Sequence, residues 1–287
     1  MDPIRRYPTV AFFTLAYAIA WIAWGVDKAL GGAAQGLITV GAFGPTVAAL
    51  IVVGVTERRG GIHAFLGRLR RWRLSGRLYA IALIGPALLA LGAALLDTLA
   101  GGPAPSLARQ VPAGVPQAAI VPLLPIVFLF GLLFGGPLGG EPGWRGFALP
   151  RFLAGFGPWT ASTIIGLVWG LWHIPLFEIP GTSQSALPLG AFVFWMIGLS
   201  YLSTRLYRAS DGNLPLMILF HTAINFFAGL LVLPTGTFLS TRPFLFHLGL
   251  VWLACLVLTL AARFGRTTPP VVADPTNARP DGTKAAP

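Results

Sequence analysis

Five side chains of types that can do chemistry lie in an otherwise apolar sequence: Glu141, Arg145, His173, His221 and Asn225. The first two belong to the stretch 139–147, Gly-Gly-Glu-Pro-Gly-Trp-Arg-Gly-Phe. A carboxylate and two imidazoles can bind a divalent metal ion or activate water, and an amide can donate a hydrogen bond to an oxyanion. We therefore take these five residues as the candidate catalytic set.

Glu141 precedes Arg145 by four residues, which is the favourable order for an ion pair on a helix. Such a pair can serve only to neutralise itself, because desolvation can cancel its Coulomb gain. Pro142 and Gly143 are poor helix formers, so we expect a helix break here whose freed backbone groups line a cavity. An ionisable residue at membrane depth also indicates a functional site.

The composition predicts the element type that must position these residues. The 287-residue chain is 55% hydrophobic and only 10% charged, with a mean hydropathy of +0.75, whereas about a quarter of the residues of a soluble domain are charged. Apolar runs long enough to cross a bilayer occupy eight segments: 8–26, 36–55, 78–98, 117–138, 158–177, 188–205, 214–233 and 244–263. They lack the alternation of barrel strands, so we expect an all-α bundle of eight transmembrane helices.

The basic residues are distributed unevenly between the two sides of this bundle. With the N-terminus inside, all but three of the 20 Lys and Arg residues fall in inner segments, the exceptions being Lys28, Arg109 and Arg242. This predicts that both termini are cytoplasmic, in a multi-pass protein of the cell membrane, which we take to be a bacterial inner membrane. It also explains the net charge of +11 without a nucleic-acid partner. Arginines alternate with apolar residues over 58–77, which predicts an interfacial helix that binds anionic lipid.

The chain is expected to form one membrane domain over residues 1–266, with the candidate motifs within 139–226. The remaining residues, 267–287, are rich in proline and small polar residues and have no apolar periodicity. Such a segment cannot bury enough apolar surface to fold, which predicts a disordered tail.

Three segments, read together, resemble the signature motifs of the CPBP family: 141–147, Trp-Gly-Leu-Trp-His at 169–173, and His-Thr-Ala-Ile-Asn at 221–225. This family comprises intramembrane metalloproteases of the CAAX-prenyl-endopeptidase and bacteriocin-processing (Abi) type. The resemblance extends from about the second to the seventh span, and implies an eight-helix fold with a water-filled cavity open to the cytoplasm. The resemblance also implies that the substrate of this protein is a peptide or a prenylated protein.

The resemblance also implies roles for the candidate residues. Glu141 and Arg145 match the second Glu and the Arg of the first motif, and Glu141 and His173 would activate water. His221 and Asn225 would stabilise the oxyanion of the tetrahedral intermediate. Glu141, His173 and His221 are the expected ligands if a divalent metal ion, such as zinc, is bound.

One position departs from the family pattern. The first motif normally opens with two glutamates, and the first, usually the water activator, is Gly140 here. Neighbouring helical residues point about 100° apart, so Glu141 replaces it only if the helix rotates or breaks. The alternative is a catalytically inactive member that acts in bacteriocin immunity or as a membrane scaffold. The sequence lacks the Gly-x-Ser-Gly motif of a rhomboid-type serine protease. A transporter would be expected to have two related broken helices, and the sequence suggests one break.

If the spans are straight, the two histidines lie at different depths in the membrane and cannot meet. His173 lies some fifteen residues, about 22 Å, from the inner end of its span, whereas His221 is about seven residues into its own. For them to meet, the fifth span must begin later than Pro158 or be tilted. The fourth span must also continue past Arg145 to place Glu141 inside the membrane.

Overall fold

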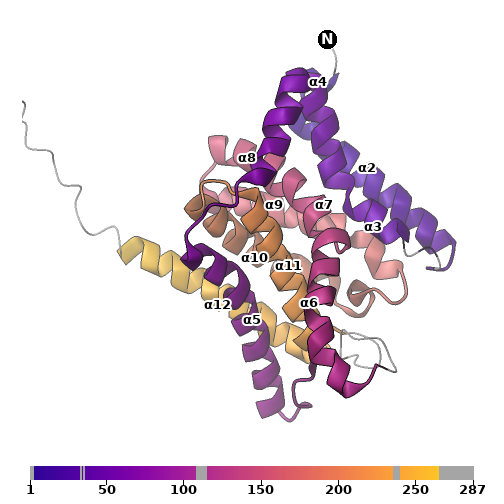
Figure 1. Ribbon diagram of the computed structural model, residues 1–287, viewed down its shortest axis with the longest axis vertical. Helices are drawn as coiled ribbons and strands as arrows, with labels where there is room; N and C mark the ends of the chain where they lie inside the picture. Colours follow the sequence, from indigo (N-terminus) through magenta and orange to yellow (C-terminus); the bar gives the residue numbers. More distant parts are fainter. Residues whose placement is uncertain (1–2, 33, 35, 108–114, 235–239, 265–287) are drawn as a thin grey trace, which may run out of the picture.

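The computed structural model describes residues 3–32, 34, 36–107, 115–234 and 240–264. Every regular element in these residues is a helix, which confirms the all-α prediction (Figure 1). The predicted tail, 267–287, lies outside the described residues. The elements in chain order are α1 (Pro3–Arg6), α2 (Pro8–Ala29), α3 (Gly36–Ala42), α4 (Gly44–Gly67), η1 (Arg68–Arg70), α5 (Gly76–Leu99), α6 (Gln117–Phe134), α7 (Pro137–Glu141), η3 (Pro142–Ala148), α8 (Leu149–Gly155), α9 (Pro158–Trp172), η4 (Ile174–Glu178), η5 (Ser183–Ala186), α10 (Leu189–Ala209), α11 (Leu214–Leu231) and α12 (Arg242–Phe264).

The described residues contain seven helical segments that are long and apolar enough to cross a membrane. An eighth is the pair α3 and α4, which meet at a 41° bend and together have the length of one span. The eight predicted spans and the multi-pass membrane location are therefore confirmed. The most enclosed span is α11, with 78% of its apolar window buried, so the bundle surrounds the helix that carries His221.

The bend between α3 and α4 provides the surface on which the central motif packs. Pro45 lies in the first turn of α4, where its missing N–H costs no hydrogen bond. A Cβ atom on Gly139 would lie 2.7 Å from the carbonyl oxygen of Ala42, and one on Gly143 would overlap the backbone of Pro45. These two glycines therefore allow α7 and η3 to lie directly against the bent backbone.

The helix break predicted at Pro142 and Gly143 is wrong, because the chain stays helical from Pro137 to Gly155. Its middle, η3, is instead a seven-residue π-helix. π-helical turns, which are wider than α-helical ones, are rare in proteins. Those that occur are often at functional sites. The membrane-crossing segment Gln117–Gly155 contains all of this stretch, so the fourth span continues past Arg145 as the meeting of the histidines requires.

The separate interfacial helix predicted over 58–77 is also wrong. The helix α4 runs on to Gly67, η1 adds one 3-10 turn, and 71–75 is irregular. The difference has a tertiary cause, since Phe65 is only 7% exposed and belongs to the hydrophobic core. Contact with anionic lipid stays a prediction for the exposed arginines of this segment.

Contacts between distant segments define the two ends of the bundle. At one end Arg68 donates to the carbonyl of Gly146 at 2.7 Å and to the hydroxyl of Tyr207 at 3.1 Å, which joins the ends of α4 and α10 to η3. We call this the arginine-rich end, and in Figure 1 it lies toward the upper left, where α8 and the start of α5 are drawn. At the opposite end an ion pair between Lys28 and Glu178 joins the ends of α2 and η4.

Candidate active site

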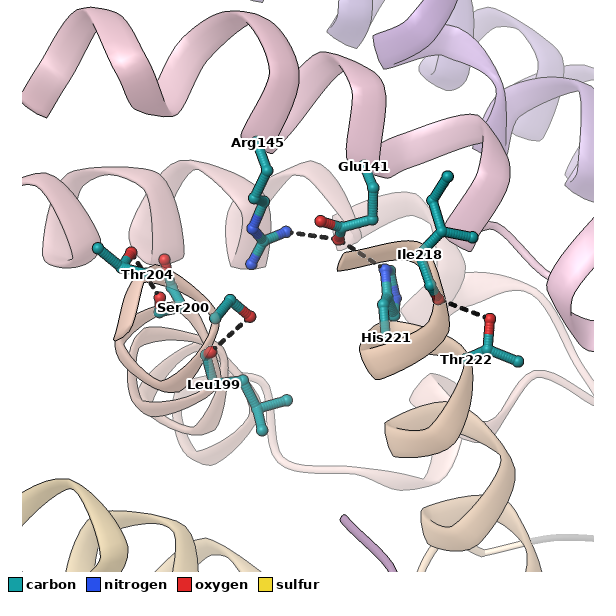
Figure 2. Close-up of polar contacts among 9 residues, drawn as sticks. Glu141, Arg145, Leu199, Ser200, Thr204, Ile218, His221 and Thr222 are labelled. Carbon is teal, nitrogen blue, oxygen red and sulfur yellow. Dashed lines mark hydrogen bonds and ion pairs between the residues drawn. The ribbon is translucent and has the colours of Figure 1, made fainter. Parts of the chain in front are cut away.

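Glu141 lies between Arg145 and His221 and contacts both with one carboxylate oxygen. Its Oε1 is 2.9 Å from Arg145 Nη1 and 2.8 Å from His221 Nδ1 (Figure 2). Glu141 is 1% exposed and Arg145 is fully buried. Because a carboxylate oxygen that accepts from a guanidinium acts as an acceptor, His221 Nδ1 carries the donated proton. The other ring nitrogen of His221, Nε2, then has a free lone pair.

His173 has the same tautomer for a different reason. It is the residue that ends α9, and its Nδ1 lies 2.8 Å from the carbonyl oxygen of Trp169, one turn earlier. A carbonyl oxygen only accepts hydrogen bonds, so Nδ1 is the donor and Nε2 again has the free lone pair. The two histidines therefore present the same kind of nitrogen for chemistry.

The indole of Trp169 lies between the two histidines. Its ring centre is 5.1 Å from that of His221 and 6.1 Å from that of His173. The guanidinium carbon of Arg145 lies 4.3 Å from the same ring, which is a cation-π contact. Trp169 thus fixes both imidazoles and the ion pair relative to one another.

A cavity of about 600 Å³ is shared by three of the five candidate residues. His173, His221, Asn225 and Gly140 line it, whereas Glu141 and Arg145 do not. Most of the remaining wall is apolar and aromatic, including Trp24, Trp144, Trp169, Trp172, Phe192 and Trp195. Glu141 can therefore act on a molecule in the cavity through His221, and the stretch 139–147 contributes Gly140 and Trp144 to the cavity wall.

The structure resolves the conflict between the depths of the histidines. The helix α9 begins at Pro158, so the alternative of a later start is wrong. His173 lies at the far end of α9 and His221 in the first half of α11, and one cavity extends along both positions. They meet across this space and across Trp169, and of the two only His221 contacts Glu141 directly.

The structure does not gather the three predicted metal ligands into one cluster. The described residues contain no group of three or more His, Cys, Asp or Glu side chains that could hold one ion. The cause is the position of Glu141, which does not line the cavity that His173 and His221 share, and whose Oε1 accepts from Arg145 and His221. The set Glu141, His173 and His221 therefore does not fit a metal ion in this arrangement.

Two further polar groups of the cavity wall were missed by the sequence analysis. Asp27 is fully buried, and its Oδ1 accepts from the backbone N–H of Ala34 at 2.9 Å while its Oδ2 has no partner. The signal for it was an acid inside the last turns of an apolar span. Trp144 Nε1 is also buried without a partner, and a Cβ atom on Gly140 would lie 3.5 Å from it. No sequence pattern pointed to that free indole N–H.

Comparison with known proteins identifies the region that carries these residues. Residues 122–227 match the family model described as type II CAAX prenyl endopeptidase Rce1-like. Over 113 residues the chain is 29% identical to the CAAX prenyl protease 2 of Methanococcus maripaludis, which covers 34% of this chain and 38% of that protein. The chain thus matches less than half the length of this relative. The family match includes all five candidate residues and confirms the resemblance to the CPBP family. On this evidence residues 122–227 of the chain are similar to the Rce1-like family of CAAX prenyl endopeptidases.

Proposed function

We propose that this protein is a membrane-embedded endopeptidase in which His221, oriented by Glu141, is the general base. The observation that carries the proposal is the 2.8 Å contact between Glu141 Oε1 and His221 Nδ1. A carboxylate on one ring nitrogen holds the other in the unprotonated form and stabilises the imidazolium that forms when it takes a proton. His221 lines the cavity, so its free Nε2 is available to a water molecule there.

In the proposed reaction His221 Nε2 takes a proton from water as the oxygen of that water bonds to the carbon of a peptide carbonyl. The tetrahedral intermediate carries its negative charge on the former carbonyl oxygen, to which the Asn225 amide donates. When the C–N bond breaks, the imidazolium returns its proton to the leaving amine. His173 Nε2 accepts the second O–H of the attacking water and so positions it. Relative to the roles implied by the resemblance, Glu141 acts here through His221 and not directly on water.

The substrate is proposed to be a polypeptide with an apolar segment next to the cleaved bond. Aromatic side chains make up much of the cavity wall, and they favour an apolar ligand. The similar protein of Methanococcus maripaludis is a CAAX prenyl protease 2, so a prenylated C-terminal peptide is the first substrate to examine.

A second candidate function is binding without catalysis, as in an immunity or scaffold protein. The observation that favours it is the cavity wall at Gly140, where no side chain projects and the neighbouring Trp144 N–H is without an acceptor. A glutamate at position 140 would supply both an acceptor for that N–H and a carboxylate in the cavity.

The test is cleavage of a farnesylated CAAX peptide and of a mixed peptide library by purified protein in detergent, followed by mass spectrometry. We expect the wild type to cleave the peptide. His221→Ala removes the general base and should lower the rate by about 10²–10⁴-fold, and His173→Ala should also lower the rate. His63→Ala is the matched control, since His63 is exposed on α4, away from the cavity. Equal rates for wild type and His221→Ala contradict the proposal. Cleavage by Gly140→Glu alone establishes the second candidate.

A further inference from the structure

We propose that a second cavity of the bundle binds the phosphate of an anionic phospholipid headgroup. This cavity, of about 500 Å³, lies at the arginine-rich end and shares no lining residue with the active-site cavity. Its two walls come from connections of the chain, residues 70–74 between α4 and α5 and residues within 210–213 between α10 and α11. We call it the arginine pocket. The inference does not depend on the proposed peptidase function.

The charge of the arginine pocket favours an anion. Arg70, Arg71 and Arg73 line it, and each is exposed. None of the three pairs with a carboxylate in the part of the chain that the structure describes. The wall contains one acid, Asp211, so three positive charges face one negative charge. A guanidinium can donate two parallel hydrogen bonds to a phosphate and is less strongly hydrated than an ammonium, so arginine is well suited to bind this group.

Side chains of neighbouring elements hold the backbone of the pocket in place. The side-chain amide of Asn213 donates to the carbonyl of Arg71, and the hydroxyl of Tyr79 donates to the next carbonyl along the chain. Arg68, just before the pocket, donates to the carbonyl of Gly212 at 3.3 Å and thereby joins the two walls. A ligand therefore has to order only the arginine side chains, which keeps the entropic cost of binding small.

The position of the pocket makes a lipid the source of the phosphate. Both walls end within two residues of a membrane-crossing segment, Gly76–Leu99 after the first wall and Leu214–Leu231 after the second. Trp72, in the first wall, is 58% exposed, and an indole at the end of a span is typical of the headgroup layer. The arginines thus lie at the depth of lipid phosphates. The helix α5, which begins beside the pocket, offers exposed apolar side chains to the acyl chains: Ile81, Ile84 and Leu88.

Native mass spectrometry of the purified protein in detergent tests the inference. The probes are phosphatidylglycerol, which is anionic, and phosphatidylcholine with the same acyl chains, which has no net charge. We expect the wild type to retain phosphatidylglycerol more strongly. The pocket variant combines Arg70→Gln, Arg71→Gln and Arg73→Gln, and it should lose about fivefold in affinity per arginine, roughly 10²-fold in total.

The matched control replaces three exposed arginines outside the pocket, Arg5, Arg59 and Arg263, with glutamine. Its affinity for phosphatidylglycerol should stay close to that of the wild type. Asp211→Asn gives a test of the opposite sign, because removal of the one acid in the wall should raise this affinity. Asparagine also suits the backbone there, since residue 211 has a φ of 51°.

Equal retention of the two lipids by the wild type overturns the inference, and so does an equal affinity of the pocket variant and its control for phosphatidylglycerol. Displacement of the lipid by millimolar inorganic phosphate also overturns it, because the pocket would then be a site for a soluble anion. If the triple variant does not fold, Arg73→Gln against Arg263→Gln gives the same comparison, with an expected loss of about fivefold. None of these measurements involves peptide cleavage, so their outcome is separate from that of the proposed function.

Discussion

Removal of the Glu141 carboxylate should destabilise the protein strongly, because Arg145 would remain as an uncompensated buried charge. The two side chains are 2.9 Å apart and 2% and 0% exposed, so water cannot replace the lost partner. Breaking a buried pair by removing one partner costs about 3–5 kcal/mol. The cation-π contact with Trp169 remains and offsets a part of this, on the order of 0.5–2 kcal/mol. For Glu141→Ala we expect a net loss of roughly 2–4 kcal/mol.

The assay is thermal unfolding in detergent, followed by the loss of monodisperse protein. Each kcal/mol corresponds to roughly 2–4 °C in soluble domains of 150–250 residues, so the midpoint should fall by about 10 °C. The matched control is Glu178→Ala, since Glu178 also pairs with a cation but is 60% exposed, as in surface pairs worth about 0–1 kcal/mol. A midpoint of Glu141→Ala equal to that of Glu178→Ala would refute the buried pair.

Two further predictions concern pairs of glycines that the structure places in different surroundings. Gly143→Ala should cost about 1–3 kcal/mol or prevent folding, because its Cβ overlaps the backbone of Pro45; Gly155→Ala, with open space around it, should not lower the unfolding midpoint. Gly140→Glu should fold, since its side chain enters the cavity beside an indole, whereas Gly139→Glu should not, since it meets the backbone of α3. Equal yields of folded protein within either pair would contradict the packing of α7 and η3.

Much of the fold could be predicted from the sequence, because a bilayer leaves few solutions for a chain of this composition. The length and polarity of each run determine where a span begins and ends to within a few residues. The ion pair of Glu141 and Arg145 could also be predicted, because the two residues are only four positions apart on one helix.

The contacts that the sequence analysis missed are tertiary. The contact of Glu141 with His221 joins residues 80 positions apart, and nothing local distinguishes it from the expected contact with His173. The segment 58–67 has the amphipathic pattern of a surface helix, yet α4 continues through it because Phe65 packs into the core. The free N–H of Trp144 depends on the shape of the cavity, which no single segment specifies.

The central claim is that Glu141 acts on the reaction through His221, and Glu141→Gln tests it most directly. The amide keeps the size of the side chain and can still accept from Nδ1, but it cannot stabilise an imidazolium. With a peptide that the wild type cleaves, we expect kcat to fall by about 10²–10⁴-fold while KM stays close to the wild-type value. A kcat for the folded Glu141→Gln protein equal to that of the wild type would contradict the claim.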